Sequence, residues 1–255
     1  DYGPATLKYR LFEGDGADEF DTFDLRTSQN YSWAIDGVAG HYDTLVQEVF
    51  CRETLGALGQ PTTRSRYYHL YLNGQYWGLF NTDERSEASY GETYFGGNKE
   101  DYDVLKVETG PYDVQATDGN LDAWTRLYNL AKAGLGSDDA YQRVQGNNPD
   151  GTRNPAYENL VDVPNLIDYM LVMLYGGNLD APISNFLGNT RPNNWWGVRN
   201  RNGTDGFRFF VHDAEHTLLN LNEDRTGPYP AGDTSVVYSN PKWIWQKLQA
   251  NAEFS

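Results

Sequence analysis

The chain has little cysteine, no long apolar run and few basic residues. Its one cysteine, Cys51, excludes an intrachain disulfide. No apolar run approaches the roughly 18 residues that a membrane-spanning helix needs, so no membrane span is predicted. Lys and Arg number 20 against 36 Asp and Glu, which gives a net charge of -16. A field of that sign repels phosphate backbones, and because no basic patch interrupts it, nucleic-acid binding is not expected.

Aromatic residues, by contrast, are abundant. They make up 15% of the 255 residues, with 19 Tyr and 7 Trp. Such a composition is unlike that of a disordered chain, and the length suffices to bury a sizeable core. The acidity suits solubility, divalent cations and basic protein partners. A solvated acidic surface without a partner is the plainer alternative.

The residue pattern predicts an α+β fold in which a sheet-rich N-terminal part precedes a mainly helical C-terminal part. In the first part, Asn73-Gly74 joins two aromatic-rich strands and is a strong hairpin signal. In the second part, a strongly apolar helix begins with Pro164 and ends before Gly176. The expected strands are residues 7–12, 23–27, 67–72, 76–80, 102–107, 194–198 and 207–211, and the expected helices are residues 41–58, 86–95, 121–133, 163–175 and 241–250.

The loop that follows the apolar helix is the first candidate for a functional site. Structureless loops of this length in compact domains are usually functional or disordered, and the aromatic residues here argue against disorder. The loop carries Asp180, with Asn185 at the spacing found in protein kinases and Asn194 directly before the next strand. The second strand of that hairpin runs into HDAEH, where Asp213 and Glu215 alternate along an extended segment and can face one side together.

Two kinds of metal site fit this arrangement. In the first, the carboxylates and an amide hold Mg²⁺ or Mn²⁺, and a loop carboxylate orients a hydroxyl nucleophile and accepts its proton. In the second, His212 and His216 bind zinc with the carboxylates between them. The two histidines would need a helix to converge, but a strand precedes Asp213, so the first interpretation is favoured. Hydrogen-bonded packing is the plainer role for both histidines.

A nucleotide site also needs a cation on the phosphates. Lys106 lies between apolar neighbours on a predicted strand, where a lysine usually has a partner. Glu84, between a strand and a helix, is the expected partner, and Arg85 is a further phosphate ligand. Trp195 is a candidate for stacking on a base. A surface lysine, a carboxylate at a helix start and a core tryptophan are the alternatives at these positions.

Two long segments resemble the CotH (spore-coat H) kinase family. The first is YHLYLNGQYWGLFNTDERSEASY followed by YFGGNKEDYDVLKV, similar to the family's hairpin, its Glu before a helix and its Lys on the next strand. The second comprises DAPISNFLGNTRPNNWWGVRN and GFRFFVHDAEHTL, similar to the family's Asp loop, Asn-aromatic-aromatic strand and strand ending in Asp-x-acid. The resemblance runs from about Leu7 to the end of the chain. It is closest to secreted forms from environmental bacteria.

The resemblance implies an atypical protein-kinase-like fold whose C-terminal hairpin carries the metal site. It implies transfer of phosphate from ATP, with Mg²⁺ or Mn²⁺, to Ser or Thr of a secreted or surface protein. Carried over, Asp180 is the catalytic Asp and Asp213 the principal metal ligand, with Glu215 beside it. Asn185 keeps the kinase spacing, whereas Asn194 precedes the aromatic strand as the family's Asn does. Asn194 is favoured as the amide ligand.

The same resemblance assigns Lys106 and Glu84 to the phosphate side of the nucleotide. It implies a bacterial protein that is secreted or displayed at the cell surface. Residues 1–255 are expected to form one kinase-like domain with approximate lobes at 1–110 and 111–255. Because family members continue beyond both ends, we expect the chain to be truncated and to belong with other domains of a longer protein.

Three departures from ordinary protein kinases bear on activity. No Gly-x-Gly-x-x-Gly is present, Asn178-Leu179 stands where His-Arg precedes the catalytic Asp, and Asp213-Ala214-Glu215 replaces Asp-Phe-Gly. The family tolerates all three. A protein kinase is therefore the leading hypothesis. A catalytically inactive binding or assembly module is the second, and a metal-dependent hydrolase centred on the two histidines is the third.

Overall fold

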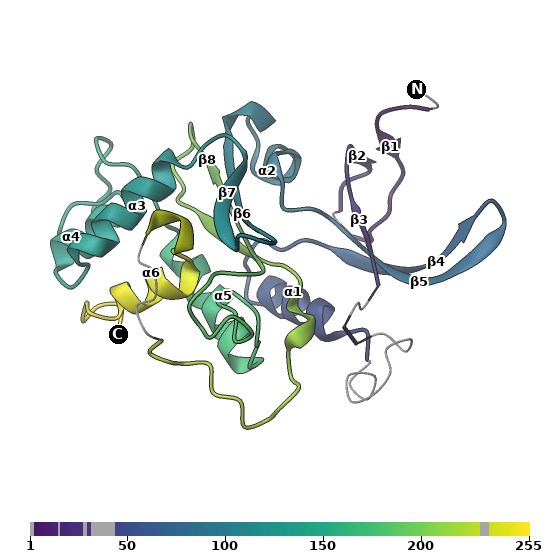
Figure 1. The fold of residues 1–255 in the computed structure, drawn as a ribbon. Coiled ribbons are helices and arrows are strands. Elements are labelled where there is room, and N and C mark those ends of the chain that lie inside the picture. Colours follow the sequence, from purple (N-terminus) through teal and green to yellow (C-terminus); the bar gives the residue numbers. More distant parts are fainter. Residues whose placement is uncertain (1–2, 15, 28–29, 32–43, 230–234) are drawn as a thin grey trace.

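The computed structural model describes residues 3–14, 16–27, 30–31, 44–229 and 235–255, and it confirms the predicted α+β class. Figure 1 shows helices gathered around one sheet, with a second sheet beside it from which a long hairpin projects. No described helix is long and apolar enough to cross a membrane. The helices are α1 (Gln47–Ala57), α2 (Ala88–Phe95), α3 (Asp122–Ala133), α4 (Asp138–Val144), α5 (Val163–Tyr175) and α6 (Pro241–Leu248), and the strands are β1 (Leu7–Lys8), β2 (Glu19–Phe20), β3 (Asp24–Arg26), β4 (Ser65–Leu72), β5 (Gln75–Asp83), β6 (Tyr102–Glu108), β7 (Asp113–Asp118), β8 (Trp195–Asn200) and β9 (Arg208–Val211).

The projecting hairpin belongs to an antiparallel sheet of order β3-β5-β4. Asn73 and Gly74 both have positive φ, 51° and 79°, as a two-residue turn that matches the strand twist requires. β3 pairs only with residues 81–83 of β5, so the outer part of the hairpin extends away from the body (Figure 1). The inner end of this sheet, where β3 meets β5, is therefore the part that borders the rest of the molecule.

The second sheet has the order β7-β6-β8-β9 and is also antiparallel. β7 was not predicted, because its sequence DVQATD offers no run of aromatic or β-branched residues. In the centre of the sheet, Leu105 pairs with Gly197 and Lys106 with Trp196. β6 precedes residue 110 and β7, β8 and β9 follow it, yet all four belong to this sheet. The approximate division into lobes at residues 1–110 and 111–255 therefore falls inside the β6–β7 hairpin.

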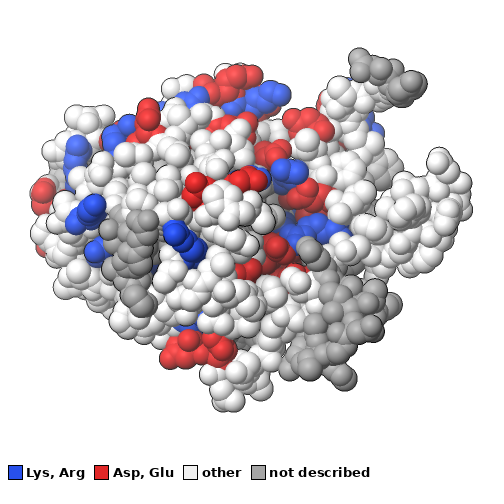
Figure 2. Space-filling view, viewed as in Figure 1, with Lys and Arg blue, Asp and Glu red and all other residues white. Residues whose placement is uncertain are grey.

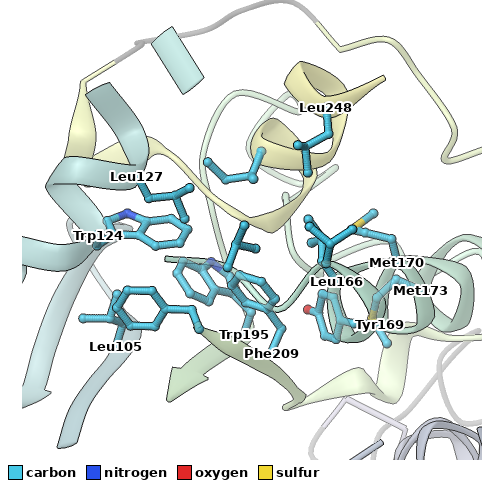
Figure 3. Close-up of a cluster of buried hydrophobic side chains, with 14 of the residues drawn as sticks. Leu105, Trp124, Leu127, Leu166, Tyr169, Met170, Met173, Trp195, Phe209 and Leu248 are labelled. Atoms are coloured by element: carbon cyan, nitrogen blue, oxygen red, sulfur yellow. The ribbon is translucent and has the colours of Figure 1, made fainter. Parts of the chain in front are cut away.

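The main hydrophobic core lies between this sheet and helices α3, α5 and α6 (Figure 3). α5 buries one face at helical spacing, and Asp162 caps it by accepting a hydrogen bond from the Asn165 backbone N–H at 3.1 Å. Trp124 of α3 packs against Trp195 of β8 with ring centroids 5.3 Å apart. The core therefore fixes β8 and β9, whose ends carry the candidate site.

Two predicted elements differ from the structure at the N-terminal end. The strand expected at 7–12 covers only Leu7–Lys8, because Phe12 instead packs into a small cluster with Phe20. The helix expected from residue 41 has its predicted start outside the described residues, and α1 begins at Gln47. Cys51 is wholly buried on α1, as expected for a small core residue.

Candidate functional site

The loop after α5 and the ends of β8 and β9 bring Asp180, Asn194 and Asp213 together. Asn194 Nδ2 lies 3.0 Å from Asp180 Oδ2 and 3.4 Å from the backbone oxygen of Asp213. Asn194 directly precedes β8 and Asp213 follows the end of β9, and these two strands are paired through Trp195 and Val211. The register of the sheet therefore sets the distance between the amide and the second carboxylate.

The carboxylate of Asp180 is held on both oxygens. Oδ1 accepts a hydrogen bond from the Ser184 hydroxyl, and Oδ2 accepts from the side-chain amides of Asn193 and Asn194, each at 3.0 Å. The Asn178 side chain accepts from the Asp180 backbone N–H at 2.8 Å. Asp180 is 8% exposed and so reaches solvent from a fixed position. Ser184 and Asn193 could not be found from the sequence, because the loop that carries them has no regular period.

Asn194 and Asp213 both have left-handed backbone conformations, with φ of 51° and 47°. Residues other than glycine are uncommon in this region, although Asn and Asp tolerate it better than most. Such strain persists where the surrounding structure enforces it, and it is concentrated at functional sites. Here it occurs at two residues in hydrogen-bond contact, which supports a functional role for the pair.

Asp213 is the end of a series of buried and partly buried charges that the sequence did not reveal. Arg26, the last residue of β3, is ion-paired with Asp213 and lies 3.2 Å from Glu48 Oε2. Glu48 Oε1 accepts hydrogen bonds from the Asp213 backbone N–H at 3.0 Å and from Arg52 Nε at 3.1 Å. Arg52 Nη2 lies 3.7 Å from Asp83 Oδ2 at the end of β5. Both sheets and α1 are thus joined to Asp213 by charged side chains.

Glu48 and Asp83, two of the three carboxylates in this group of charges, have opposite pKa shifts. Burial alone would raise the pKa of Glu48, but Arg52 and Arg26 outweigh it and lower the pKa to about 2. For Asp83 burial dominates, and the attraction of Arg52 offsets only part of it, so its pKa is raised to about 6. Neither Asp83 oxygen has a hydrogen-bond partner among the described residues. The folded protein therefore stabilises the charged form of Glu48 relative to the unfolded chain, whereas it destabilises the charged form of Asp83.

We expect Asp83→Asn to gain stability relative to the wild type as the pH rises from 4 to 6. A carboxyl whose pKa is raised from 3.8 to about 6 on folding holds its proton more tightly in the folded state. Its contribution to stability therefore falls across that window, and it is fully unfavourable above it. Urea midpoints at pH 4, 5, 6 and 7 measure the difference. The exposed control Asp139→Asn should parallel the wild type, and a parallel course for Asp83→Asn would contradict the assignment.

The histidines of the HDAEH segment have packing partners. His216 Nδ1 lies 2.7 Å from the Tyr31 hydroxyl, and the His212 ring packs edge-on against Trp196 with centroids 5.8 Å apart. Burial lowers the pKa of both, to about 4 for His212. Across the described part of the chain, no group of three or more His, Cys, Asp and Glu side chains could hold a metal ion. The described residues thus give the zinc alternative no ligand set.

Two further predicted metal ligands are engaged elsewhere. Glu215 is buried and accepts hydrogen bonds from the backbone N–H of Asn30, at 3.3 Å, and from its side chain. Asn185 is exposed, and its Oδ1 lies 3.5 Å from both Arg225 Nη1 and Asn189 Nδ2. Of the two amides left open by the sequence, the structure places Asn194, not Asn185, in contact with Asp180.

Lys106 and Glu84 do not form the ion pair expected of them. Lys106 Nζ lies 3.5 Å from Glu108 Oε2, on the partly exposed face of β6. Glu84 is buried, pairs with Arg64 at 3.3 Å and accepts a hydrogen bond from Tyr94. The prediction was wrong because it was based only on the secondary-structure elements that carry the two residues. The sequence did not indicate that a third residue, Arg64, pairs with the Glu84 carboxylate.

Arg85 and Trp195 have contrasting positions. Arg85 is partly exposed, lies 3.0 Å from Asp24 Oδ1 and has its guanidinium over the Trp196 ring. Trp195 is wholly buried in the core against Trp124, so its stacking on a base is incompatible with this structure. The reason is strand alternation, which turns Trp195 into the core and Trp196 toward Arg85 and Lys106.

The donors at the site fit a hard divalent cation. Asp213 offers a carboxylate, and Asn194, whose Nδ2 is turned toward Asp180, offers its amide oxygen. Mg²⁺ is usually held by one or two protein carboxylates, with substrate phosphates and water completing the shell. Figure 2 shows acidic and basic side chains interleaved on the visible face, and not separated into one acidic patch. Because the protein offers one carboxylate and one amide oxygen here, a cation would bind together with a nucleotide and not through protein ligands alone.

An α+β domain in which two strand ends and the loop after a helix bring together two carboxylates and an amide, backed by ion pairs, has the parts of a kinase-like phosphotransfer site. The chain belongs to the CotH kinase protein family, whose model matches residues 31–255. No curated protein matches the chain at a significant level. Family membership indicates a kinase-like function, and a kinase family implies ATP and a divalent metal as cofactors.

Proposed function

We propose that the chain transfers the γ-phosphate of ATP to a Ser or Thr hydroxyl of a secreted or surface protein. The observation that supports this most is the contact of Asn194 with both Asp180 and Asp213. Phosphoryl transfer needs little covalent chemistry from the protein and depends on positioning and charge neutralisation. A site of two carboxylates and one amide, held in a fixed relation by a sheet, meets that need.

Asp180 would orient the acceptor hydroxyl and take its proton. Its hydrogen bonds from Ser184 and Asn193 limit rotation of the carboxylate, so that one orientation is presented. Asp213 and Asn194 would hold the Mg²⁺ or Mn²⁺. That metal, when bound, neutralises charge on the nucleotide phosphates.

Arg26 and Glu48 take the role first considered for Lys106 and Glu84. A cation on a strand, paired with a glutamate on a neighbouring helix, is the arrangement that protein kinases use beside the phosphates. Arg26 already contacts both Glu48 and Asp213. A cation at Asp213 would compete for that carboxylate and leave the Arg26 guanidinium available to a phosphate.

The test is transfer of label from γ-labelled ATP, with Mn²⁺ or Mg²⁺, to Ser- and Thr-containing peptides and to the chain itself. We expect Asp213→Asn to lower the transfer rate by about 10²- to 10³-fold, the usual cost of losing one group that stabilises charge in the transition state. The exposed Asp139→Asn serves as the matched control. A wild type that transfers no label, or an Asp213→Asn variant as fast as the wild type, would overturn the proposal. ATP-dependent thermal stabilisation without transfer would instead indicate an inactive binding module.

A further inference from the structure

A pocket of about 280 Å³ opens beside Asp180, and neither the metal nor the nucleotide explains it. Asp180 is the only Asp, Glu, Lys or Arg among the described residues that line it. Its other walls come from four places in the chain: the segment after β3, the β6–β7 turn, the loop after α5, and the segment after β9. They are Asn30, Tyr112, Ser184, Phe186, Leu187, Asn193 and His216.

Phe186 forms an exposed apolar wall of this pocket. Its side chain is 58% exposed, and its ring packs on His216 with centroids 4.9 Å apart. Phe186 and Leu187 line the same pocket as the fixed carboxylate of Asp180, and apolar walls with a few placed polar groups are typical of ligand pockets.

The loop that carries Phe186 is held by its own hydrogen bonds. The Ser184 backbone N–H donates to the Arg191 carbonyl at 3.0 Å. The guanidinium of buried Arg225 donates to the Ile183 carbonyl at 3.0 Å and to Asn189 Oδ1 at 2.9 Å. The wall is therefore ordered before a ligand binds, so binding carries little further entropy cost for ordering this loop.

We infer that this pocket receives the acceptor segment and selects an uncharged, apolar side chain next to the Ser or Thr hydroxyl. The inference rests on the proposed function, because it requires the hydroxyl to reach Asp180. Neighbouring residues of an extended acceptor lie about 3.5 Å apart along the chain, so a residue next to the Ser or Thr would lie within the same pocket, which Phe186 and Leu187 line. An apolar side chain is covered there, whereas an acidic one meets Asp180 and finds no Lys or Arg in the described lining.

The experiment uses a set of peptides with one central Ser in a Gly/Lys background. Leu or Glu is placed in turn at each of the two positions before and after the Ser. With wild type, Leu at one position should raise kcat/KM about 10-fold over Gly, the lower end of what an apolar pocket discriminates, and Glu there should lower it. Phe186→Ala should abolish the Leu preference, so that kcat/KM becomes equal for the Leu- and Gly-flanked peptides, and leave the KM for ATP unchanged. Leu221→Ala, at a side chain 93% exposed and outside the pocket, is the matched control.

Binding of fluorescein-labelled peptides, measured by anisotropy without ATP, separates this inference from the proposed function. Transfer without any flanking preference, or a preference that survives Phe186→Ala, overturns the inference and leaves the function standing. Leu-dependent binding that Phe186→Ala removes, without transfer, supports the pocket and overturns the function. If the chain shows no transfer and no Leu-dependent binding, both the inference and the proposed function are overturned.

Discussion

Asp180→Asn should lower kcat for phosphate transfer by about 10²- to 10⁴-fold, the usual contribution of a positioned general base. The substitution keeps the size of the side chain and a hydrogen-bonding oxygen for Ser184, but it removes the group that would take the hydroxyl proton. Because Asp180 faces the acceptor pocket, affinity for ATP should change little. Steady-state kcat and the KM for ATP, measured on the same peptide, give the two quantities.

The matched control for Asp180→Asn is Asp150→Asn. Asp150 is an exposed carboxylate that hydrogen-bonds within its own turn to Thr152. It should have wild-type kcat and KM. If Asp180→Asn retained most of the wild-type kcat, Asp180 would not be the catalytic Asp, and a loss of ATP affinity equal to the loss of rate would place it on the nucleotide side instead.

The proximity of Asp180, Asn194 and Asp213 could be predicted because the three residues lie on one hairpin and on the loop that leads into it. Asn194 and Asp213 stand at the paired ends of one hairpin, whose strands were visible as apolar runs. Asp180 lies in the loop that follows the apolar helix α5, and that helix packs on β9 of the hairpin. Local pattern pointed to the loop and the hairpin as the place of the site, whereas the preference for Asn194 over Asn185 came from the family resemblance.

The chain of charges behind Asp213 could not be predicted in the same way. Arg26 and Asp213 are 187 residues apart in the sequence, and no period or motif links them. Glu48 and Arg52, one helical turn apart, were a visible pair, but i,i+4 pairs are common on exposed helices and do not reveal burial. Only the contacts of the Glu48 and Arg52 side chains with Arg26 and Asp83 at the strand ends show that these charges are removed from solvent.

The orientation of Trp195 could not be predicted from the sequence for a different reason. Alternation of polar and apolar residues usually tells which side of a strand faces the core. In β8, Trp195 to Arg199 are all buried, since helices and side chains cover both faces, so the sequence WWGVRN carries no such alternation. The choice between Trp195 and Trp196 as the ring nearer the site had no signal in the sequence.

Arg52→Met should destabilise the protein by about 3–5 kcal/mol, the usual cost of removing one partner from a buried group of charges. The guanidinium is 4% exposed, and it contacts Glu48, Asp83 and the Thr63 hydroxyl. Met keeps much of the apolar stem, so the expected loss comes from the two carboxylates left without this partner, not from an empty space. Urea unfolding at pH 7, followed by tryptophan fluorescence, measures the free energy of unfolding.

Arg126→Met tests whether burial causes that loss. Arg126 forms a bidentate pair with Glu158, with both side chains nearly half exposed, and such surface pairs contribute about 1 kcal/mol or less. In the Arg52→Met background, adding Asp83→Asn should recover part of the stability, because it removes a buried charge whose pKa is already raised. Equal losses for Arg52→Met and Arg126→Met, or no recovery in the double variant, would show that these charges are solvated and that α1 is not held to Asp213 through them.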